Sequence, residues 1–329
     1  MGLAIGIDVG KALVVIIFLQ AAFGYLTLIE RKLLGRFQLR PGPNRVGPFG
    51  LLQPLADGVK LLFKEEIIPA GVDRFVFLVA PMLSLLGALM AFAVIPFGAP
   101  VHIFGRTVPL QVAGPSLSLL YVFAVASLGV YGIVLGGWSS QNKYGLLGGL
   151  RSSAQIISYE LAMGLSVIGV LLAAGSANLN QIVSAQTREW FVFPQIVGFI
   201  VYFICAIAET NRAPFDLPEA EQELVAGYHT EYTGMKFAMF FMAEYINMIT
   251  VSALATTLFL GGWHGPAFLP SYLWFLIKVA IFLFVFVWLR ATLPRLRYDR
   301  LMAFGWKILL PVALLNAIGT AAWVALVHP

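Results

Sequence analysis

The stretch Ala208–Tyr232, with the sequence AETNRAPFDLPEAEQELVAGYHTEY, determines how the rest of the chain is organised. It holds six of the 16 acidic residues of a chain that is 60% hydrophobic and 11% charged, and Arg212 is its only Lys or Arg. Long apolar segments flank it on both sides, so we interpret it as a loop between two membrane spans. An acidic loop in this position either solvates a surface or takes part in proton transfer or partner binding.

The rest of the chain is apolar enough to lie in a membrane, with a mean hydropathy of +0.87. A transmembrane helix needs about 20 apolar residues, and eight segments meet that requirement. They are residues 11–29, 75–96, 117–137, 155–174, 190–208, 236–261, 271–291 and 303–327. The sequence therefore predicts an all-α, multi-pass integral membrane protein with eight transmembrane helices in a single domain, 1–329.

The basic residues indicate which loops face the cytoplasm. Lys and Arg concentrate in the loops after the first, third, fifth and seventh spans, whereas the other three connecting loops carry only Arg106 and Arg188. Positively charged loops stay on the cytoplasmic side. The even number of spans then places both termini outside, and the net charge of +5 belongs to loops beside a membrane and does not indicate nucleic acid.

The first cytoplasmic loop, about residues 30–74, has a pattern of its own. RPGPNRVGPFG (40–50) is a rigid turn rich in Pro and Gly, and LLQPLADGVKLLFKEE (51–66) follows it. In the second segment the apolar residues recur at near-helical spacing, and Asp57, Lys60 and Lys64 fall on the other side. The segment is too short to span a membrane, so it predicts an amphipathic helix at the interface after the first span. A simple anchor without further role is the alternative.

Four glutamates lie in the cytoplasmic half of predicted spans, namely Glu30, Glu160, Glu209 and Glu244. A charge near the bilayer centre costs about 2.5–3.5 kcal/mol on insertion scales, so each needs a physical reason. If their faces point inward, the four form a line that can pass protons from the acidic loop toward the middle of the membrane. The alternative is that each carboxylate pairs with a cation.

Candidate cations for such pairs are Arg31 and Lys32 beside Glu30, Arg212 beside Glu209, and Lys278 inside the seventh span. Lys278 either extends the polar path past Glu244 or reaches outward to the interface. The single cysteine and four scattered histidines cannot form an iron–sulfur, haem or structural zinc site. We therefore expect no metal here, and any redox centre lies outside this chain or is a diffusible molecule.

Aromatic and aliphatic residues are mixed with the acids of the opening stretch, including Phe215 and Tyr228. This composition suits burial under another protein, or the wall of a cavity for an apolar ligand with a polar head, and leaves the two open. Pro218, Glu219 and Glu221 suit the first turn of a short helix.

Four stretches together resemble a known family. They are IERKLLGRFQLRPGPNRVGPFGLLQPLADGVKLLFKE (29–65), GWSSQNKYGLLGGLRSSAQIISYE (137–160), the opening stretch, and FMAEYINM (241–248). They are similar to the H membrane subunit of bacterial NADH–quinone oxidoreductase (respiratory complex I), a relative of mitochondrial subunit 1. The resemblance implies a non-redox subunit of a proton-pumping enzyme in the bacterial inner membrane. It also implies quinone as substrate, NADH and iron–sulfur clusters in partner subunits, and contacts with two peripheral-arm subunits, small membrane subunits and lipid.

The resemblance further implies roles for individual residues. The loops at about 30–74 and 209–235 would border the quinone chamber, and its side chains would be Arg31, Arg40, Asp57, Arg212, Phe215, Asp216 and Tyr228. The path coupling the chamber to proton pumping would use Glu160, Glu209 and Glu244, with Glu219, Glu221 and Glu223 of the acidic loop. Some relatives carry a glutamate where this chain has Ser127, so that position is no obligatory carboxylate relay here.

Three other functions compete with this one. A stand-alone proton-coupled secondary transporter would also explain intramembrane acids, but it predicts internal repeats, and none is evident. A structural anchor would not need Glu244. A membrane-bound hydrogenase would use an equivalent subunit without quinone, and the full loop motifs favour the quinone enzyme.

Overall fold

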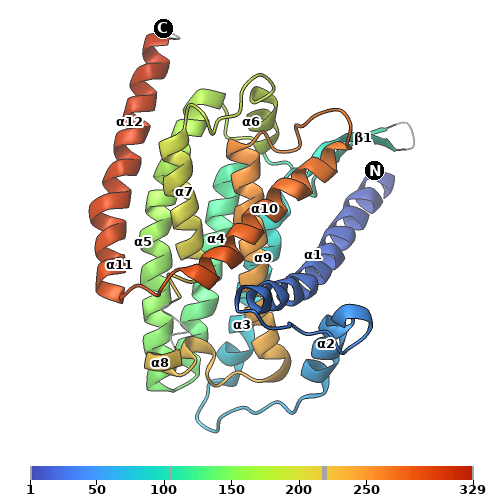
Figure 1. Ribbon diagram of the computed structural model, residues 1–329, viewed down its shortest axis with the longest axis vertical. Coiled ribbons are helices and arrows are strands. Elements are labelled where there is room, and N and C mark those ends of the chain that lie inside the picture. The colour runs from blue at the N-terminus through green and yellow to red at the C-terminus, as the bar shows by residue number, and fades with distance from the viewer. Residues whose placement is uncertain (1, 104–105, 217–220, 328–329) are drawn as a thin grey trace.

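The computed structural model describes residues 2–103, 106–216 and 221–327, and it is almost entirely helical (Figure 1). The helices are α1 (Gly2–Phe37), α2 (Gln53–Phe63), α3 (Arg74–Phe92), α4 (Ser118–Ser139), α5 (Lys143–Ala174), α6 (Leu179–Ala185), α7 (Ile196–Glu209), α8 (Glu221–Leu224), α9 (Gly234–Phe259), α10 (Ser271–Thr292), α11 (Tyr298–Phe304) and α12 (Leu310–Val327). The prediction of an all-α membrane protein is confirmed.

Seven helical segments in the described residues are long and apolar enough to cross a membrane. The predicted fifth span corresponds to α7, which has only 14 residues and reaches about 21 Å at 1.5 Å per residue, short of a hydrocarbon core of about 30 Å. It starts late because Pro194 and the turns before it interrupt the helix. The predicted count of eight crossings therefore stays a prediction.

The late start of α7 leaves a polar residue, Gln195, inside the bundle. Its side chain is 4% exposed, donates to Thr320 Oγ1 at 2.9 Å and accepts from Asn316 Nδ2 at 3.0 Å. Backbone outside a helix is tolerated at membrane depth only where protein covers it. Here α12 supplies the cover.

The centre of the bundle is α9, whose most apolar window is 67% buried, the largest share among the seven segments. Small residues on its surface let neighbouring helices approach closely. Its buried hydroxyls bond to carbonyls four residues earlier, as Thr250 Oγ1 does to Ile246 at 2.9 Å and Thr256 Oγ1 to Ser252 at 3.0 Å. These hydroxyls therefore pack inside the bundle with their hydrogen bonds made.

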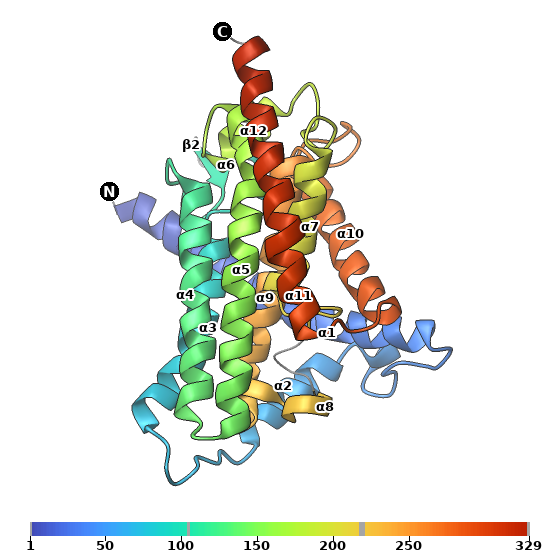
Figure 2. The same cartoon turned by 90° about the vertical axis from the view of Figure 1, so that its left-hand side faces the viewer.

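A β-hairpin, β1 (Gly98–Ile103) and β2 (Arg106–Leu110), lies between α3 and α4. The sequence analysis did not predict it. Both ends of the chain lie toward the hairpin, and α2 and α8 lie at the opposite end (Figures 1 and 2). This arrangement agrees with termini on one side and the charged loops on the other.

The amphipathic segment forms α2, shorter than the 16-residue stretch read from the sequence and without a buried residue. It packs on α1, where Pro54 Cβ lies 3.2 Å from the position of a Cβ on Gly24. The last span combines α11, a π-helical turn at Gly305–Leu309 and α12. Figure 2 shows this span running beside α5.

Candidate functional site

The acidic loop is fastened to α5 by Gln155. Gln155 is fully buried, and its Nε2 donates to the carbonyls of Ala208 at 2.8 Å and Phe215 at 2.9 Å. Close backbone packing adds to this, since a Cβ on Gly148 would lie 2.7 Å from Gly227 Cα. The loop is therefore fixed against α5 both before Leu217 and at Gly227.

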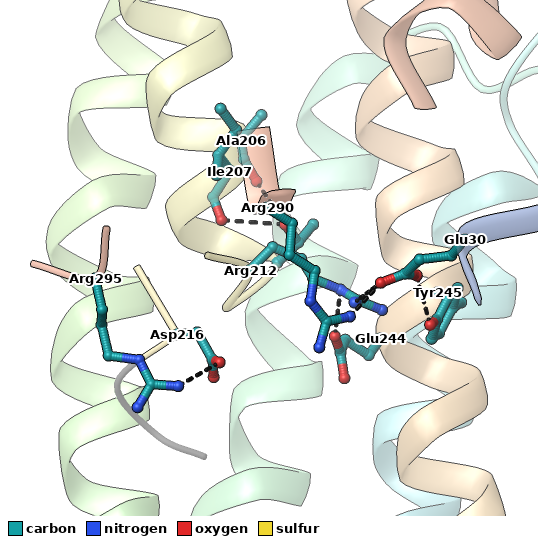
Figure 3. A network of polar contacts seen from close by, with 10 residues as sticks. Glu30, Ala206, Ile207, Arg212, Asp216, Glu244, Tyr245, Arg290 and Arg295 are labelled. Carbon is teal, nitrogen blue, oxygen red and sulfur yellow. Dashed lines mark hydrogen bonds and ion pairs between the residues drawn. The ribbon is translucent and has the colours of Figure 1, made fainter. Parts of the chain in front are cut away.

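A buried cluster of charges lies where this loop meets α1, α9 and α10 (Figure 3). Arg212 is 6% exposed and Glu30 is 3% exposed, so both have left water. Arg212 Nη1 lies 3.0 Å from Glu30 Oε1, and Arg212 Nε lies 2.6 Å from Glu244 Oε1. Arg290 also bonds Glu30, and Tyr245 Oη donates to Glu30 Oε2 at 2.6 Å. We call these five residues the Arg212 cluster.

The Arg212 cluster joins four segments that are distant in sequence: α1, the acidic loop, α9 and α10. Two carboxylates oppose two guanidinium groups, and the ring of Tyr245 lies 4.3 Å from the Arg212 guanidinium carbon. Burial disfavours the charge of Arg212, but Glu244 and Glu30 outweigh burial and hold its pKa well above the usual value. Buried charges require this degree of pairing.

The pairs differ from those expected. Arg212 was expected beside Glu209 and instead bonds Glu30 and Glu244. Lys32 was expected beside Glu30, but residues two apart on a helix point to different sides, and Lys32 donates to the Phe49 carbonyl.

Glu209, the last residue of α7, is in a different situation. Its Oε2 is buried without a hydrogen-bond partner among the described residues. It lines a cavity of about 50 Å³ together with Glu244, Asn247 and Tyr228. One water needs roughly 10–15 Å³ measured in this way, so the cavity has room for a few waters. The structure thus brings Glu209 and Glu244 together around a small polar space.

Glu160 lies on the neighbouring helix and faces another space. Ser127 Oγ donates to Glu160 Oε1, and both residues line an open groove of about 490 Å³. Ile156, one turn before Glu160 on α5, lines the cavity that contains Glu209. Glu160 is therefore near the Glu209 cavity without lining it.

Arg31, which was expected beside Glu30, pairs instead with Asp57, another of the predicted chamber residues. Arg31 Nη1 lies 2.8 Å from Asp57 Oδ2, and both line a cavity of about 180 Å³ between α1, α2 and α9 whose other walls are mostly apolar. Burial disfavours the charged form of Asp57, but hydrogen bonds from Arg31 and Gln53 hold its pKa below the usual value. An apolar cavity with one charged pair at its wall suits a ligand with an apolar body and a polar head.

The other predicted chamber residues are spread over separate places. Arg40 is exposed and donates to Gln38 Oε1 at 2.7 Å, in a basic turn apart from the Arg31–Asp57 cavity. Asp216 pairs with Arg295 at 2.9 Å. Phe215 packs against the ring of Tyr159, 5.8 Å away.

The remaining loop residues divide into buried and surface positions. Tyr228 lines the Glu209 cavity and meets His229 edge to face. Burial lowers the pKa of His229 to about 4. Glu223 forms a surface pair with Arg151 at 2.8 Å. Glu219 lies outside the described residues, as does the side chain of Glu221.

Lys278 does not extend the carboxylate line. Its Nζ donates to the carbonyls of Leu260 at 2.6 Å, Gly262 at 3.0 Å and His264 at 2.6 Å. It also lies 4.6 Å from the ring centre of Trp190. These carbonyls end α9 on the side away from the acidic loop, so Lys278 closes a helix terminus. The expected outward reach is the better of the two interpretations. No cluster of three or more metal-binding side chains occurs in the described part of the chain.

Comparison with known proteins identifies the family. The profile described as NADH dehydrogenase matches residues 10–321. The chain belongs to this family. It is 56% identical to an H subunit of NADH-quinone oxidoreductase from Geobacter sulfurreducens, the one numbered 1, over 97% of this chain and 95% of that one. It is 59% identical to the H subunit of NADH-quinone oxidoreductase from Protochlamydia amoebophila, over 91% of this chain and 92% of that one.

These findings confirm the resemblance drawn from the four motifs. A member of this family with seven long apolar helices is a multi-pass protein of the bacterial inner membrane, as predicted. Sequence reasoning missed Arg290 and Arg295, which form ion pairs with Glu30 and Asp216, and Tyr245, which donates a hydrogen bond to Glu30. Tyr245 adjoins Glu244 in the sequence. Arg290 and Arg295 carried no local signal, because their partners lie far away in the chain.

Proposed function

We propose that this chain is the membrane subunit of a proton-pumping NADH–quinone oxidoreductase, where it borders the quinone chamber and links quinone reduction to proton movement. Its family supports the subunit assignment. The transporter and the hydrogenase subunit are not favoured. Electrons would come from NADH through iron–sulfur clusters in partner subunits, with two peripheral-arm subunits over the cytoplasmic loops and small membrane subunits alongside.

Quinone would reach the chamber through the cavity between α1, α2 and α9. This cavity opens between a membrane-spanning helix and an interfacial helix, and Arg31 and Asp57 supply its polar side. The isoprenoid tail would lie on the apolar walls and the head group would pass the ion pair. The acidic loop and the Arg212 cluster would form the inner wall.

Proton coupling would depend on Glu209. The observation that carries this proposal is a buried carboxylate oxygen without a hydrogen-bond partner in the described residues, on a cavity that has room for water. Glu244 shares the cavity but is held by Arg212, and Glu160 is one turn of α5 away. Quinone reduction would change the charge near the loop, and protons would redistribute among these acids through the cavity.

The test is Glu209→Gln in the assembled complex, reconstituted in vesicles. Positioned acids and bases contribute roughly 10²–10⁴-fold to proton transfer, so we expect quinone reduction and proton pumping to fall about tenfold or more. NADH oxidation by an acceptor that bypasses quinone should be unchanged. Glu189→Gln is the matched control, since its side chain is exposed in the loop between α6 and α7, and it should behave as wild type.

Quinone reduction and pumping at wild-type rates in Glu209→Gln would rule out this role. Glu160→Gln should lower coupled activity in the same assay. Glu244→Gln is harder to interpret because it also breaks the ion pair with Arg212.

For the chamber, Asp57→Asn should weaken the binding of a quinone-site inhibitor, and unchanged binding would remove Asp57 from the site.

A further inference from the structure

A large apolar crevice lies at the side of the bundle, away from the cavities described above. It has a volume of about 900 Å³ and is lined by α7, the end of α10, α11 and the beginning of the acidic loop. Its inner wall includes Phe203 and Ile207 of α7, and its outer wall includes Phe304 and Ile308. The α11–α12 span runs beside α7, as Figure 2 shows.

Two cations lie in this otherwise apolar lining. Arg300 and Lys307 are seven residues apart, two turns of helix, and Ala303 and Phe304 between them lie on the same face. The described residues that line the crevice include no Asp or Glu. Neither cation forms an ion pair with a described residue, whereas the neighbouring Arg295 and Arg297 each do.

The position of Lys307 makes this charge costly without a partner. It lies nine residues past Tyr298, roughly 13 Å along the span, and its side chain is exposed. A cation on the surface of a span is costly unless it reaches the interface or meets an anion. Its flexible stem can reach back toward Arg300 and the cytoplasmic surface, so the two cations would frame one anionic group at the mouth of the crevice.

We propose that this crevice binds one anionic phospholipid from the cytoplasmic leaflet. Arg300 and Lys307 would hold the phosphate of its head group, and an acyl chain would lie between Ile207 and Ile308. Basic pockets between transmembrane helices on the cytoplasmic side bind acidic head groups. The charge and the apolar depth of the crevice match the two halves of such a lipid.

The shape of the crevice is set by contacts that do not need the lipid. Tyr159 Oη donates to the Leu301 carbonyl at 2.9 Å, and Trp306 Nε1 donates to Ser158 Oγ at 3.2 Å. Gly305 allows the Tyr159 ring to approach within 3.3 Å of the place of a Cβ. Since α11 is held on α5 by these contacts, the crevice is a preformed site. Phe215 and Pro214 form its floor, so the lipid would pack against the turn that follows Arg212.

The test uses the assembled complex and phosphatidylglycerol with a photoreactive group at the end of one acyl chain, compared with phosphatidylcholine carrying the same chain. Mass spectrometry of the peptides locates the label. We expect phosphatidylglycerol to label peptides that contain Ile207 or Ile308, and phosphatidylcholine to label them weakly. Each basic side chain near an anionic lipid strengthens binding several-fold, so Arg300→Gln with Lys307→Gln should raise the half-saturating concentration roughly thirtyfold.

Three further variants make the test specific. Arg300→Lys with Lys307→Arg keeps both charges and should keep the labelling. Arg74→Gln with Lys143→Gln removes two exposed cytoplasmic cations elsewhere and should also keep it. Ala303→Trp fills the crevice with both cations in place and should abolish the label even if the charge-removal variant does not assemble.

Three outcomes would overturn the proposal. Equal labelling by the two lipids, unchanged when the charges are removed, would mean that the crevice is only bathed in bulk lipid. Loss of the label on addition of a quinone analogue would make the crevice a quinone site. Absence of lipid label together with a cross-link to another subunit would mean that protein covers it.

Discussion

Two buried cations of this protein have different kinds of partner. Arg212, near the cytoplasmic end, is held by the carboxylates of Glu30 and Glu244. Lys278, at the opposite end of the bundle, is held by three backbone carbonyls. Carbonyls do not change their protonation, so we expect the Lys278 site to hold structure. Carboxylates can, and Glu244 of the Arg212 cluster also lines the Glu209 cavity.

The comparison indicates that burial of a charge alone does not mark a proton path. Both cations would satisfy a search for intramembrane charge, yet Arg212 is the one of the two that pairs with carboxylates beside a cavity with room for water. The useful distinction is between a carboxylate with a cation, such as Glu244, and a buried one without a hydrogen-bond partner in the described residues, such as Glu209. Four changes test this distinction.

The largest effect is expected for Arg212→Gln. Removing one partner of a buried ion pair leaves uncompensated charge and costs about 3–5 kcal/mol, so the melting temperature and the amount of assembled complex should both fall. Adding Glu244→Gln to this variant should recover part of the loss, because one of the two carboxylates that have lost Arg212 is then neutral. Equal stability of single and double variants would mean that the pair is not coupled.

Lys278→Met should cost about 2–4 kcal/mol, because charge-assisted hydrogen bonds to three carbonyls are lost. Since no carboxylate is involved, turnover per folded complex should remain at the wild-type level, as measured by quinone reduction normalised to bound subunit. Lys11→Met, which breaks a pair with the exposed Asp8, is the control and should change stability by less than about 1 kcal/mol. Lost coupling in folded Lys278→Met would contradict the structural role.

His229 is a third buried basic side chain, and unlike Arg212 and Lys278 it is neutral. Burial lowers its pKa to about 4. The unfolded chain binds a proton near pH 6.5, so between these values it holds more protons than the folded state, and stability falls as pH drops from about 6.5 to 4. The loss should reach at most about 3 kcal/mol. In His229→Phe the melting temperature should depend less on pH than in wild type between about pH 7.5 and 5, and equal slopes would rule out this contribution.

The smallest effect on stability is expected for Glu209→Gln. An amide of the same shape at a site without a cation should change the unfolding free energy by less than about 1 kcal/mol. Thermal melting of the complex measures this, with Glu30→Gln as the contrasting variant, which should lose far more. A large loss in Glu209→Gln would show that Glu209 has a structural partner.

The sequence was enough to predict the membrane class and seven of the long helices, because hydrophobic length and loop charge report both directly. It did not predict that Arg31 pairs with Asp57, since Arg31 was expected beside Glu30. The sequence did not predict that Arg212 turns toward Glu30, 182 positions away, because a contact between distant helices depends on packing and has no local pattern. The short α7 was extended too far for a similar reason, since apolar turns covered by α12 have the composition of a helix.

The wide turn at Gly305–Leu309 has a consequence for the last span. The buried residues Leu301, Gly305, Leu309, Ala313, Ala317 and Thr320 recur at intervals of mostly four, wider than the 3.6 residues of a regular helix. In a regular helix, residues four apart are rotated slightly relative to one another, so the buried stripe would wind around the helix axis. The π-helical turn holds more residues per turn and cancels part of this rotation. Deleting one residue from it would rotate everything beyond by about 100° and turn Thr320 away from Gln195. The outer half of the span is thus kept in phase with its neighbours by a single irregular turn.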